Sequence, residues 1–381
     1  MRILATIFIA ALCSSAATSQ INPPPFLFTE MDGSHLLDNG MEVPIWGYGL
    51  SADGFITLPG PLLEYETGQD VNLTFSNPSP ESHTIHLHGL DVDQANDGVP
   101  TTSFMVVMGG VGEYSFVAPH PGTYLYHCHV TTTLHLTMGM YGMILVHHPQ
   151  GLLYDGGPTF HSNAPLLFSD LEIETNLTSV QSFPFHDIRP DYFMVNGLSG
   201  SQLENPEAIL SCPNGEELAL RLGSMAYTKV VVEFPSELNA TCYMSDGRPV
   251  PEPFDTQTLE IYPGERFTVL ISTPTPDYDG TFEVQYYDMV SGDYESSNFV
   301  RFRDASLNID ELVNAELQIS PNPASSTAQV SGQGPWKIID LLGKTVMEGT
   351  SNTIDITSLE SSSYQIIREG KTSKFIVQKP N

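Results

Sequence analysis

The sequence predicts an all-β protein made of two β-sandwich domains followed by a small β-sandwich module. Three observations carry this prediction. Short runs rich in β-branched and aromatic residues recur along the 381-residue chain. Turn residues separate these runs and are abundant, with 31 Gly and 29 Pro. No segment sustains the 3.6-residue apolar period of an amphipathic helix.

Residues 1–19 have the composition of an export signal. Arg2 precedes an apolar run from Ile3 to Leu12, and small residues follow it as far as Ser19. The apolar run is too short to cross a bilayer, and no later segment is long and apolar enough to do so. We therefore expect cleavage near Ser19 and a secreted product without a membrane span.

The expected strands after the signal fall into three groups. Residues 20–150 contain "DVNLTFSN", "GEYSFVAP" and "YGMILVHH", which predict the first sandwich. Residues 151–305 repeat the pattern with "APLLFSDLEI", "KVVVEFP" and "QTLEIYPGERFTVLIS", which predict a second sandwich. Residues 306–381 differ in composition, since six of the fourteen basic residues follow position 336. They are expected to form a linker and a small strand-rich module.

The charge is strongly negative and unevenly distributed. The formal net charge is −31, which argues against nucleic acid or an anionic membrane as partner. Residues 20–188 hold eighteen acidic and no basic side chains. Such a field favours cationic or neutral small molecules over anions. An acidic surface suited to a saline habitat is the alternative explanation.

Three cysteines remain after the signal. In an oxidising compartment Cys212 and Cys242 are expected to pair as a disulfide within the second domain. Cys128 is then left over. A single cysteine is usually interpreted as a buried free thiol. Cys128, however, has a histidine on each side, which favours a metal ligand.

All twelve histidines lie between residues 35 and 186, and six of them form two groups. "HTIHLHG" contains His83, His86 and His88, whereas "YHCHVTTTLHLTMGM" contains His127, His129 and His135. Side chains alternate between the two faces of a strand. If the two segments pair, His83, Cys128 and His135 meet on one side. His86, His88, His127 and His129 then meet on the other. The remaining histidines are interpreted as structural: His35, His120, His147, His148, His161 and His186.

The first set combines two imidazoles with a thiolate, and Met140 follows as a weak fourth donor. These donors are those of a blue-copper centre, because soft sulfur and nitrogen ligands suit electron transfer. Met138 and Met143 are alternative axial donors or core residues. Zinc is disfavoured because structural zinc sites carry more thiolates at closer spacing. The second set, all imidazole, suits copper engaged in oxygen chemistry. The loop that carries His135 is expected to approach solvent, where electrons would enter.

These two motifs resemble the copper signatures of multicopper oxidases, the laccase-like cupredoxin family. "LEYETGQDVNLTF", "DGVP" and "GTYLYHCH" are similar to the family's first domain. "LLFSDLEI", "DYFMVNG" and "LEIYPGERFTVLIS" are similar to a second domain without copper ligands. The resemblance implies two cupredoxin-like Greek-key domains.

By the same resemblance His83, Cys128, His135 and Met140 would bind type 1 copper. His86, His88, His127 and His129 would bind type 2/type 3 copper, with Asp97 delivering protons. A small-molecule or metal-ion reductant would be oxidised and dioxygen reduced.

The chain also departs from the family pattern. A trinuclear copper cluster in this family takes eight histidines, and this chain offers four. A homo-oligomer that brings two copies together would supply the rest. A non-catalytic copper-binding or electron-transfer protein is the alternative. Copper nitrite reductase is a weaker one, because Thr84 and Ile85 stand where that enzyme has an aspartate.

The C-terminal module resembles the type IX secretion sorting domain of Bacteroidetes. The similar segments are "ISPNPAS", "IIDLLGK" and the lysine-containing last strand. This resemblance implies passage through the periplasm and the type IX secretion machinery, to the cell surface or the medium. A small adhesion module is the alternative.

Overall fold

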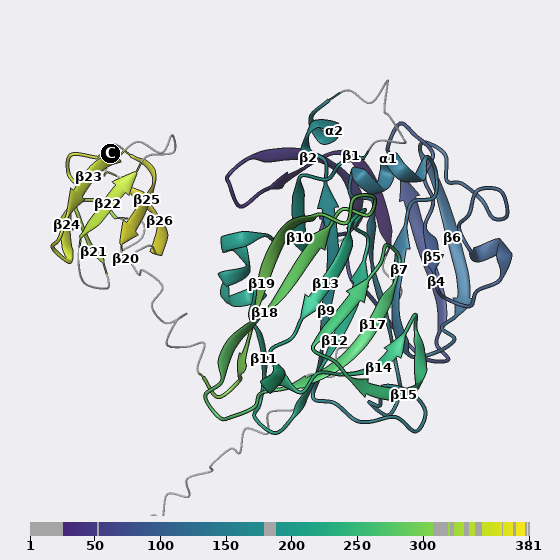
Figure 1. Cartoon of the computed structure of the whole chain (residues 1–381). Helices are drawn as coiled ribbons and strands as arrows, with labels where there is room; N and C mark the ends of the chain where they lie inside the picture. The colour runs from purple at the N-terminus through teal and green to yellow at the C-terminus, as the bar shows by residue number, and fades with distance from the viewer. Residues whose placement is uncertain are drawn as a thin grey trace, which may run out of the picture. The chain divides into compact units, whose positions relative to one another are not determined.

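The computed structural model describes residues 26–51, 53–178 and 188–307, then 319–320, 324–330, 335–339, 345–359, 361–368, 371–377 and 379. The expected export signal lies outside these residues. The chain separates into two compact units, the first made of Met1–Glu204 and Ala208–Asp304 and the second of Asn205–Glu207 and Ala305–Asn381. The all-β prediction is confirmed, because strands make up nearly all regular structure (Figure 1). No helix in the described part of the chain is long and apolar enough to cross a membrane.

The first domain consists of two four-stranded sheets that enclose a shared core. Their strand orders are β2-β1-β4-β6 and β3-β8-β7-β5. The first sheet contains β1 (Leu27–Leu36), β2 (Glu42–Leu50), β4 (Asp70–Asn77) and β6 (Gly110–Val117). The second contains β3 (Leu63–Glu66), β5 (His86–His88), β7 (Gly122–His127) and β8 (Tyr141–His147).

The second domain is a larger sandwich, with strand orders β10-β9-β12-β17-β14-β15 and β11-β19-β18-β13-β16. The six-stranded sheet contains β9 (Ser162–Leu171), β10 (Tyr192–Val195), β12 (Glu217–Ser224), β14 (Thr241–Ser245), β15 (Arg248–Asp255) and β17 (Arg266–Ser272). The five-stranded sheet contains β11 (Leu210–Cys212), β13 (Lys229–Glu233), β16 (Thr258–Ile261), β18 (Asp279–Tyr287) and β19 (Tyr294–Asp304).

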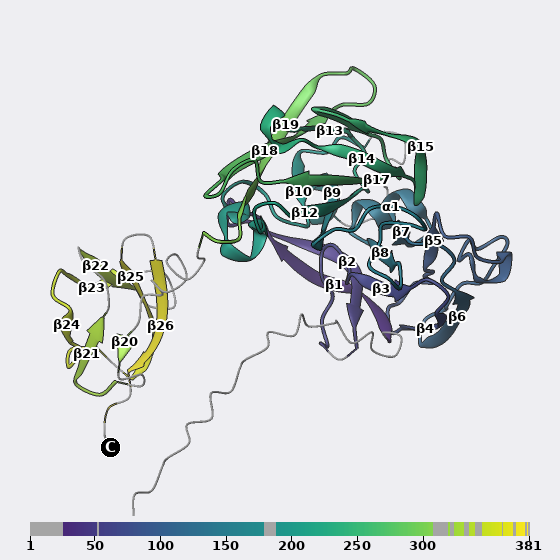
Figure 2. The ribbon, with the colours of Figure 1, turned by 90° about the horizontal axis from the view of Figure 1, so that it is seen from below.

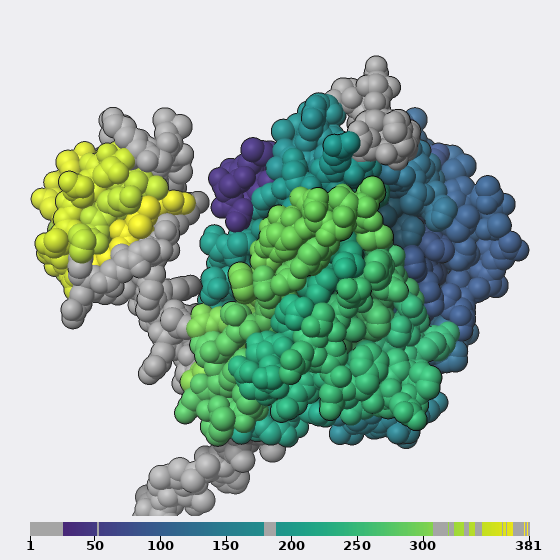
Figure 3. Space-filling view, in the orientation of Figure 1, coloured from purple at the N-terminus to yellow at the C-terminus, as the bar shows by residue number. Residues whose placement is uncertain are grey.

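In Figure 2 the sheet of β7 and β8 faces the second domain, and the β1–β2 hairpin of the other sheet also reaches that domain. Leu125, Met143 and Leu145 of β7 and β8 pack against Leu167, Leu171 and Met225 of the second domain. The domains meet without a visible gap on the face shown in Figure 3. β7 is therefore buried on both faces, one toward its own core and the other toward the second domain.

Where the structure describes the chain, helices are few and short. α1 (Thr132–Thr137) connects β7 to β8, and α2 (Ile173–Leu177) follows β9. The described residues also contain the 3-10 helices η1 (Gln94–Asn96), η3 (Gly200–Glu204), η4 (Pro206–Ala208) and η5 (Ser236–Leu238). α1 begins after Thr131, whose positive φ of 43° turns the chain sharply out of β7. This turn brings His135 back over the end of β7.

The described part of the second unit is a small β-sandwich around Trp336, Ile338 and Ile366. Its strand orders are β20-β21-β24 and β23-β22-β25-β26. The strands are β20 (Ile319–Ser320), β21 (Thr327–Val330), β22 (Trp336–Ile339), β23 (Thr345–Gly349), β24 (Thr353–Asp355), β25 (Ser362–Arg368) and β26 (Lys371–Val377).

The expected disulfide between Cys212 and Cys242 is absent, and both residues are free and fully buried. Cys212 ends β11 of the five-stranded sheet, whereas Cys242 lies on β14 of the other sheet. Each thiol packs among apolar side chains of the shared core. Burial raises the pKa of both thiols to about 11, so they stay protonated and act as small apolar residues.

Candidate metal centre

Strands β5 and β7 pair antiparallel, and their register decides which histidines meet. His86 lies opposite His127, and His88 lies opposite Leu125. On β7, Tyr124 and Tyr126 point into the first domain's core, whereas Leu125 points toward the second domain. The same alternation sends Cys128 into the core and His127 toward the second domain. Two clusters of donors therefore lie on opposite sides of one sheet edge.

The first cluster is made of His83, Cys128 and His135, all with no exposed surface. The thiol sulfur of Cys128 lies 3.6 Å from His83 Nδ1 and 3.1 Å from His135 Nδ1. One donor atom from each residue lies within 4.8 Å of the others. A single ion bonded at about 2.0–2.3 Å to each donor can occupy that space.

Met140 is fixed beside this cluster by its backbone. Its N–H donates to His135 O at 2.9 Å, and its carbonyl accepts from Cys128 N–H at 3.1 Å. Its side chain is fully buried in the core that contains Cys128, as is that of Met138. Met143 instead packs against the second domain, on the opposite side of the sheet. Met143 therefore does not belong to this set.

Burial decides the protonation of the first cluster. It lowers the pKa of His83 to about 3 and also lowers that of His135, so both imidazoles are neutral near pH 7. Burial raises the pKa of the Cys128 thiol. Neutral imidazoles have a lone pair ready for a metal, and metal binding would displace the thiol proton.

His135 does not reach solvent, contrary to the expectation from its loop. Its ring has no exposed surface, and Trp46 packs edge-on against it with ring centroids 5.4 Å apart. Its Nε2 lies 3.3 Å from a carboxylate oxygen of Glu81, whose side chain is 48% exposed. Glu81 is therefore the surface group through which His135 contacts the exterior.

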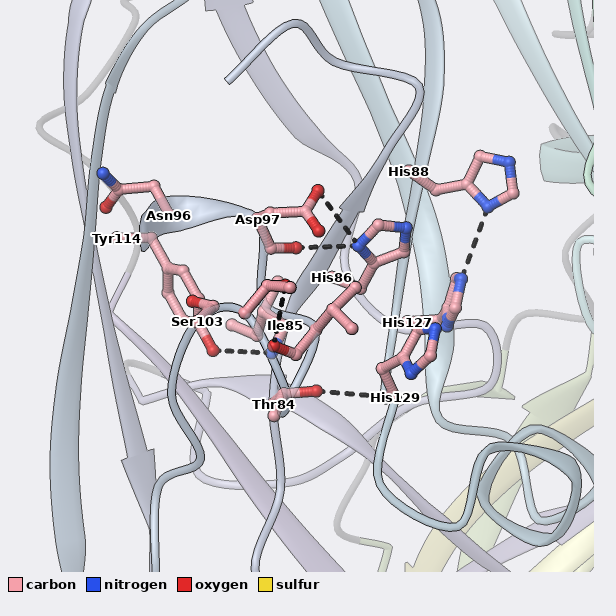
Figure 4. Close-up of polar contacts among 12 residues, drawn as sticks. Thr84, Ile85, His86, His88, Asn96, Asp97, Ser103, Tyr114, His127 and His129 are labelled. Carbon is pink, nitrogen blue, oxygen red and sulfur yellow. Dashed lines mark hydrogen bonds and ion pairs between the residues drawn. The ribbon is translucent and has the colours of Figure 1, made fainter. Parts of the chain in front are cut away.

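The second cluster gathers four imidazoles at the end of β5 and β7 (Figure 4). Donor atoms of His86, His88 and His127 lie within 4.8 Å of one another. The ring of His129 has its centroid 5.3 Å from that of His86 and 5.9 Å from that of His127. His86, His88 and His127 are therefore close enough together to bind one metal ion, and His129 lies beside this group.

Backbone carbonyls select the tautomers of this cluster. His86 Nδ1 lies 2.7 Å from Asp97 O, and His127 Nδ1 lies 3.1 Å from Cys128 O. Since a carbonyl only accepts, both Nδ1 atoms carry hydrogen and both Nε2 atoms keep a lone pair for a metal. The Nε2 of His127 lies 3.3 Å from His88 Nδ1, whose hydrogen it can accept when no metal is bound. Burial lowers the pKa of His127 to about 3, and burial with nearby Arg266 lowers that of His88 to about 4.

Asp97 reaches the cluster because its loop is pressed against β5. Its carbonyl also accepts from Leu87 N–H at 3.3 Å. Gly98 has a φ of +79°, and a Cβ there would lie 2.0 Å from Ile85 O. Only glycine allows this approach. The Asp97 carboxylate lies 3.5 Å from His86 Nδ1 and is partly exposed.

The second domain forms a wall of this cluster that histidine spacing did not predict. Gly264 has a φ of +84°, and a Cβ there would lie 3.0 Å from His88 Cε1. The guanidinium of Arg266 donates to Gly264 O at 2.6 Å and forms an ion pair with Asp246 at 2.8 Å. "YPGERF" marks a tight turn, but nothing in it indicates which residues the turn contacts.

The other described histidines do not belong to a metal-binding group, and four of them have a hydrogen-bond or ion-pair partner. His35 bonds to Gly197 O at 2.8 Å, across the two domains. Carboxylates lie beside three more, in the pairs His120–Asp91, His147–Glu64 and His148–Asp155. Metal-type groups of His, Cys, Asp and Glu occur only at the two clusters among the residues the structure describes. His186 lies outside those residues.

Comparison with known proteins agrees with this geometry. Residues 54–151 match the family model "Multicopper oxidase". The segment carrying both clusters is thus similar to a multicopper oxidase domain. It resembles copper resistance protein A of Pseudomonas syringae pv. tomato, 37% identical over 101 residues, or 26% of this chain and 16% of that protein. The chain is also 33% identical over 117 residues to copper-containing nitrite reductase of Neisseria gonorrhoeae, covering 30% of this chain and 28% of that protein.

Solved structures extend the likeness to both domains. Blue copper oxidase from Nitrosomonas europaea superposes with a TM-score of 0.60 at 25% identity, covering 74% of this chain and 86% of that one. The curated relatives named above are matched over less than a third of their own length.

Copper is the metal that the multicopper oxidase relatives imply, and both clusters fit it. One offers a thiol with two neutral imidazoles, and the other offers histidines of which two present an Nε2 lone pair.

Proposed function

We propose that the chain is a laccase-like multicopper oxidase that takes electrons from a small reductant and delivers them to dioxygen. The observation that carries this proposal is the position of Cys128. Its side chain enters the first cluster, whereas His127 and His129 on either side of it enter the second. Bound copper would supply the one-electron chemistry at both clusters. Cys128 would then link them through its own backbone bonds.

The chain's own groups position the reacting centres. His83, Cys128 and His135 are held in a core that excludes water, which favours a fixed donor geometry in both oxidation states. Glu81 holds His135 Nε2 and presents a carboxylate to solvent. We propose that the reductant docks at Glu81. Asp97 lies against His86 and is partly exposed, which suits it to carry protons to the second cluster.

The number of metal ions at the second cluster depends on assembly. Three donors within 4.8 Å suit one ion in a single chain. A homo-oligomer that brings two second clusters together would supply eight histidines and a larger centre. Copper per chain, measured together with the mass of the assembly, separates these two arrangements.

Oxygen uptake by the copper-loaded full chain with a phenolic or cuprous donor tests the function. Cys128→Ser should remove the blue thiolate–copper absorption and lower oxygen uptake at least a hundredfold. The buried serine changes little volume, so the thermal unfolding temperature of the copper-free protein should change by only a few degrees. A full blue band in Cys128→Ser would contradict the assignment of this thiol.

Two other outcomes would indicate different functions. A blue protein that exchanges electrons but consumes no oxygen would be a copper-binding or electron-transfer protein. Reduction of nitrite without oxygen would indicate a nitrite reductase, the activity named for the Neisseria relative. The acidic first domain disfavours an anionic substrate.

We also propose export through the periplasm to the cell surface or the medium. The signal-like residues 1–19 support export, and the separate C-terminal β-sandwich is a suitable sorting domain for type IX secretion. Deletion of residues 306–381 should retain the protein inside a host that has this machinery, with its blue colour unchanged. Normal release of the truncated chain would refute the sorting role.

A further inference from the structure

Arg266, the first residue of β17, places a buried positive charge beside the second cluster. Its side chain is only 6% exposed. A Cβ on Gly89 would lie 2.2 Å from a terminal nitrogen of the guanidinium, so this group lies against the backbone that directly follows His88. The guanidinium also donates to Gly264 O at 2.6 Å, and Gly264 lies against the His88 ring. Contacts with both domains therefore hold the charge of Arg266 close to His88.

The first domain has no cation of its own to place at the second cluster. Residues 20–188 contain no Lys or Arg, so a positive side chain here has to come from the second domain. A cation beside imidazoles that bind a metal ion repels that ion. Arg266 therefore does not strengthen metal binding by its charge, and its position calls for a different explanation.

Asp246 balances the charge of Arg266 only in part. Its carboxylate lies 2.8 Å from a guanidinium nitrogen and accepts from Arg266 N–H at 3.2 Å. The Asp246 side chain is 50% exposed, so water screens its charge more than that of buried Arg266. Among the described residues none accepts a hydrogen bond from the buried Nε of Arg266. Stability alone would favour an apolar side chain of similar volume over such a cation.

The same imbalance acts on His88. Burial contributes most to the low pKa of His88, and the charge of Arg266 comes next. Asp246 acts on this pKa in the opposite direction and by less than Arg266. Together with the burial of Arg266, this indicates a net positive field at the edge of the second cluster.

We propose that the Arg266–Asp246 pair raises the reduction potential of the copper that the second cluster binds. This inference rests on the copper site of the function proposed above. The oxidised ion carries one more positive charge than the reduced ion, so a fixed cation disfavours the oxidised ion more strongly. An electron that leaves the first cluster then reaches the second with a larger driving force. Arg266 sets the direction of this effect, and Asp246 limits its size.

Arg266→Met and Asp246→Asn test the proposal because they change the local charge in opposite directions. Redox titration of the copper-loaded full chain, followed by electron paramagnetic resonance of the second-cluster copper, measures the potential. Arg266→Met should lower the ratio of Cu(I) to Cu(II) affinity at least tenfold, which corresponds to a fall of about 59 mV for one electron. Asp246→Asn should raise the potential. Potentials that stay constant or move in the same direction would overturn the proposal.

Arg301→Met is the matched control, because Arg301 of β19 pairs with Asp279 of β18 on the five-stranded sheet. It should leave the potential of the second-cluster copper unchanged, and the blue absorption of the first cluster verifies that each variant folds. Arg266→Lys keeps the charge and should stay near the wild-type potential, so a fall as large as in Arg266→Met would contradict an effect of charge. A wild-type second cluster without copper would instead refute the proposed function, and the role of Arg266 with it.

Discussion

At the scale of single residues, Asp97 contacts His86 through two different oxygens. The backbone carbonyl fixes the imidazole at 2.7 Å, and the carboxylate lies 3.5 Å away. Asp97→Asn keeps the carbonyl and removes only the group that can exchange protons. Oxygen uptake should therefore fall at least tenfold, since proton transfer by a positioned group contributes about 10²–10⁴ in rate.

Reduction of the blue copper by the donor under anaerobic conditions should keep its wild-type rate in Asp97→Asn. Stopped-flow absorption of the blue band measures this step, and an oxygen electrode measures the overall reaction. Equal slowing of both steps would show that Asp97 supports the fold of the domain and does not deliver protons.

At the scale of elements, α1 is connected to the second domain by the hydrogen bond from Tyr227 to Thr133 O. Because α1 carries His135, Tyr227→Phe should disturb the first cluster as well as stability. We expect a loss of about 1 kcal/mol in the free energy of unfolding and a shift of the blue absorption or reduction potential. Tyr192→Phe is the matched control, because its hydroxyl accepts from Asp38 N–H, another link between the domains. A shift in the control of equal size would contradict a specific role of α1.

The loop that carries Tyr227 is held by a buried carboxylate. Asp170 accepts from Tyr227 N–H, Thr228 N–H and the Thr228 hydroxyl. Burial outweighs these bonds and raises the pKa of Asp170 from 3.8 to about 6. The folded protein thus binds this proton more tightly than the unfolded chain does. The stabilisation is present at low pH and is lost as pH rises from about 4 to 6.

Asp170→Asn isolates this titration. The free energy of unfolding of the wild type, minus that of Asp170→Asn, should fall by about 2 kcal/mol between pH 4 and pH 7. Urea unfolding of both copper-free proteins at four pH values measures it. A difference that rises with pH would mean that the hydrogen bonds keep Asp170 ionised in the folded state.

At the scale of the whole molecule, the net charge is strongly negative, and residues 20–188 contain no basic side chain. The acidic side chains of residues 20–188 meet basic groups of the second domain only in part, as in the Arg248–Asp91 pair. A net negative field should speed cationic donors and slow anionic ones. Raising salt from about 0.01 to 0.15 M shortens the screening length from roughly 30 to 8 Å. kcat/KM should therefore fall for a cationic donor and rise for an anionic one. If kcat/KM for both donors does not change with salt, the acidic surface does not steer the donor and is explained by a saline habitat.

The placement of the histidines followed largely from the sequence. Residues 126–129 alternate between two environments because a strand sends successive side chains to opposite faces, and this holds wherever the strand lies. The spacing of His83, His86 and His88 follows the same rule on the neighbouring segment. Local geometry was therefore enough to separate the two clusters.

Other features were decided by packing between distant segments. His135 is buried because Trp46 and Glu81 cover it, although its loop was expected to reach solvent. Cys212 and Cys242 are free, and each packs among apolar side chains that come from distant strands of the second domain.

The sequence by itself determined the all-β class and the two sets of donors, because both depend on periods of a few residues. Only the tertiary structure decided that Gly264 and Tyr227 of the second domain enclose a cavity beside His88 and His127. Such contacts join residues 100 to 176 positions apart. They depend on how two sheets stack, and no short-range pattern in the chain encodes that packing.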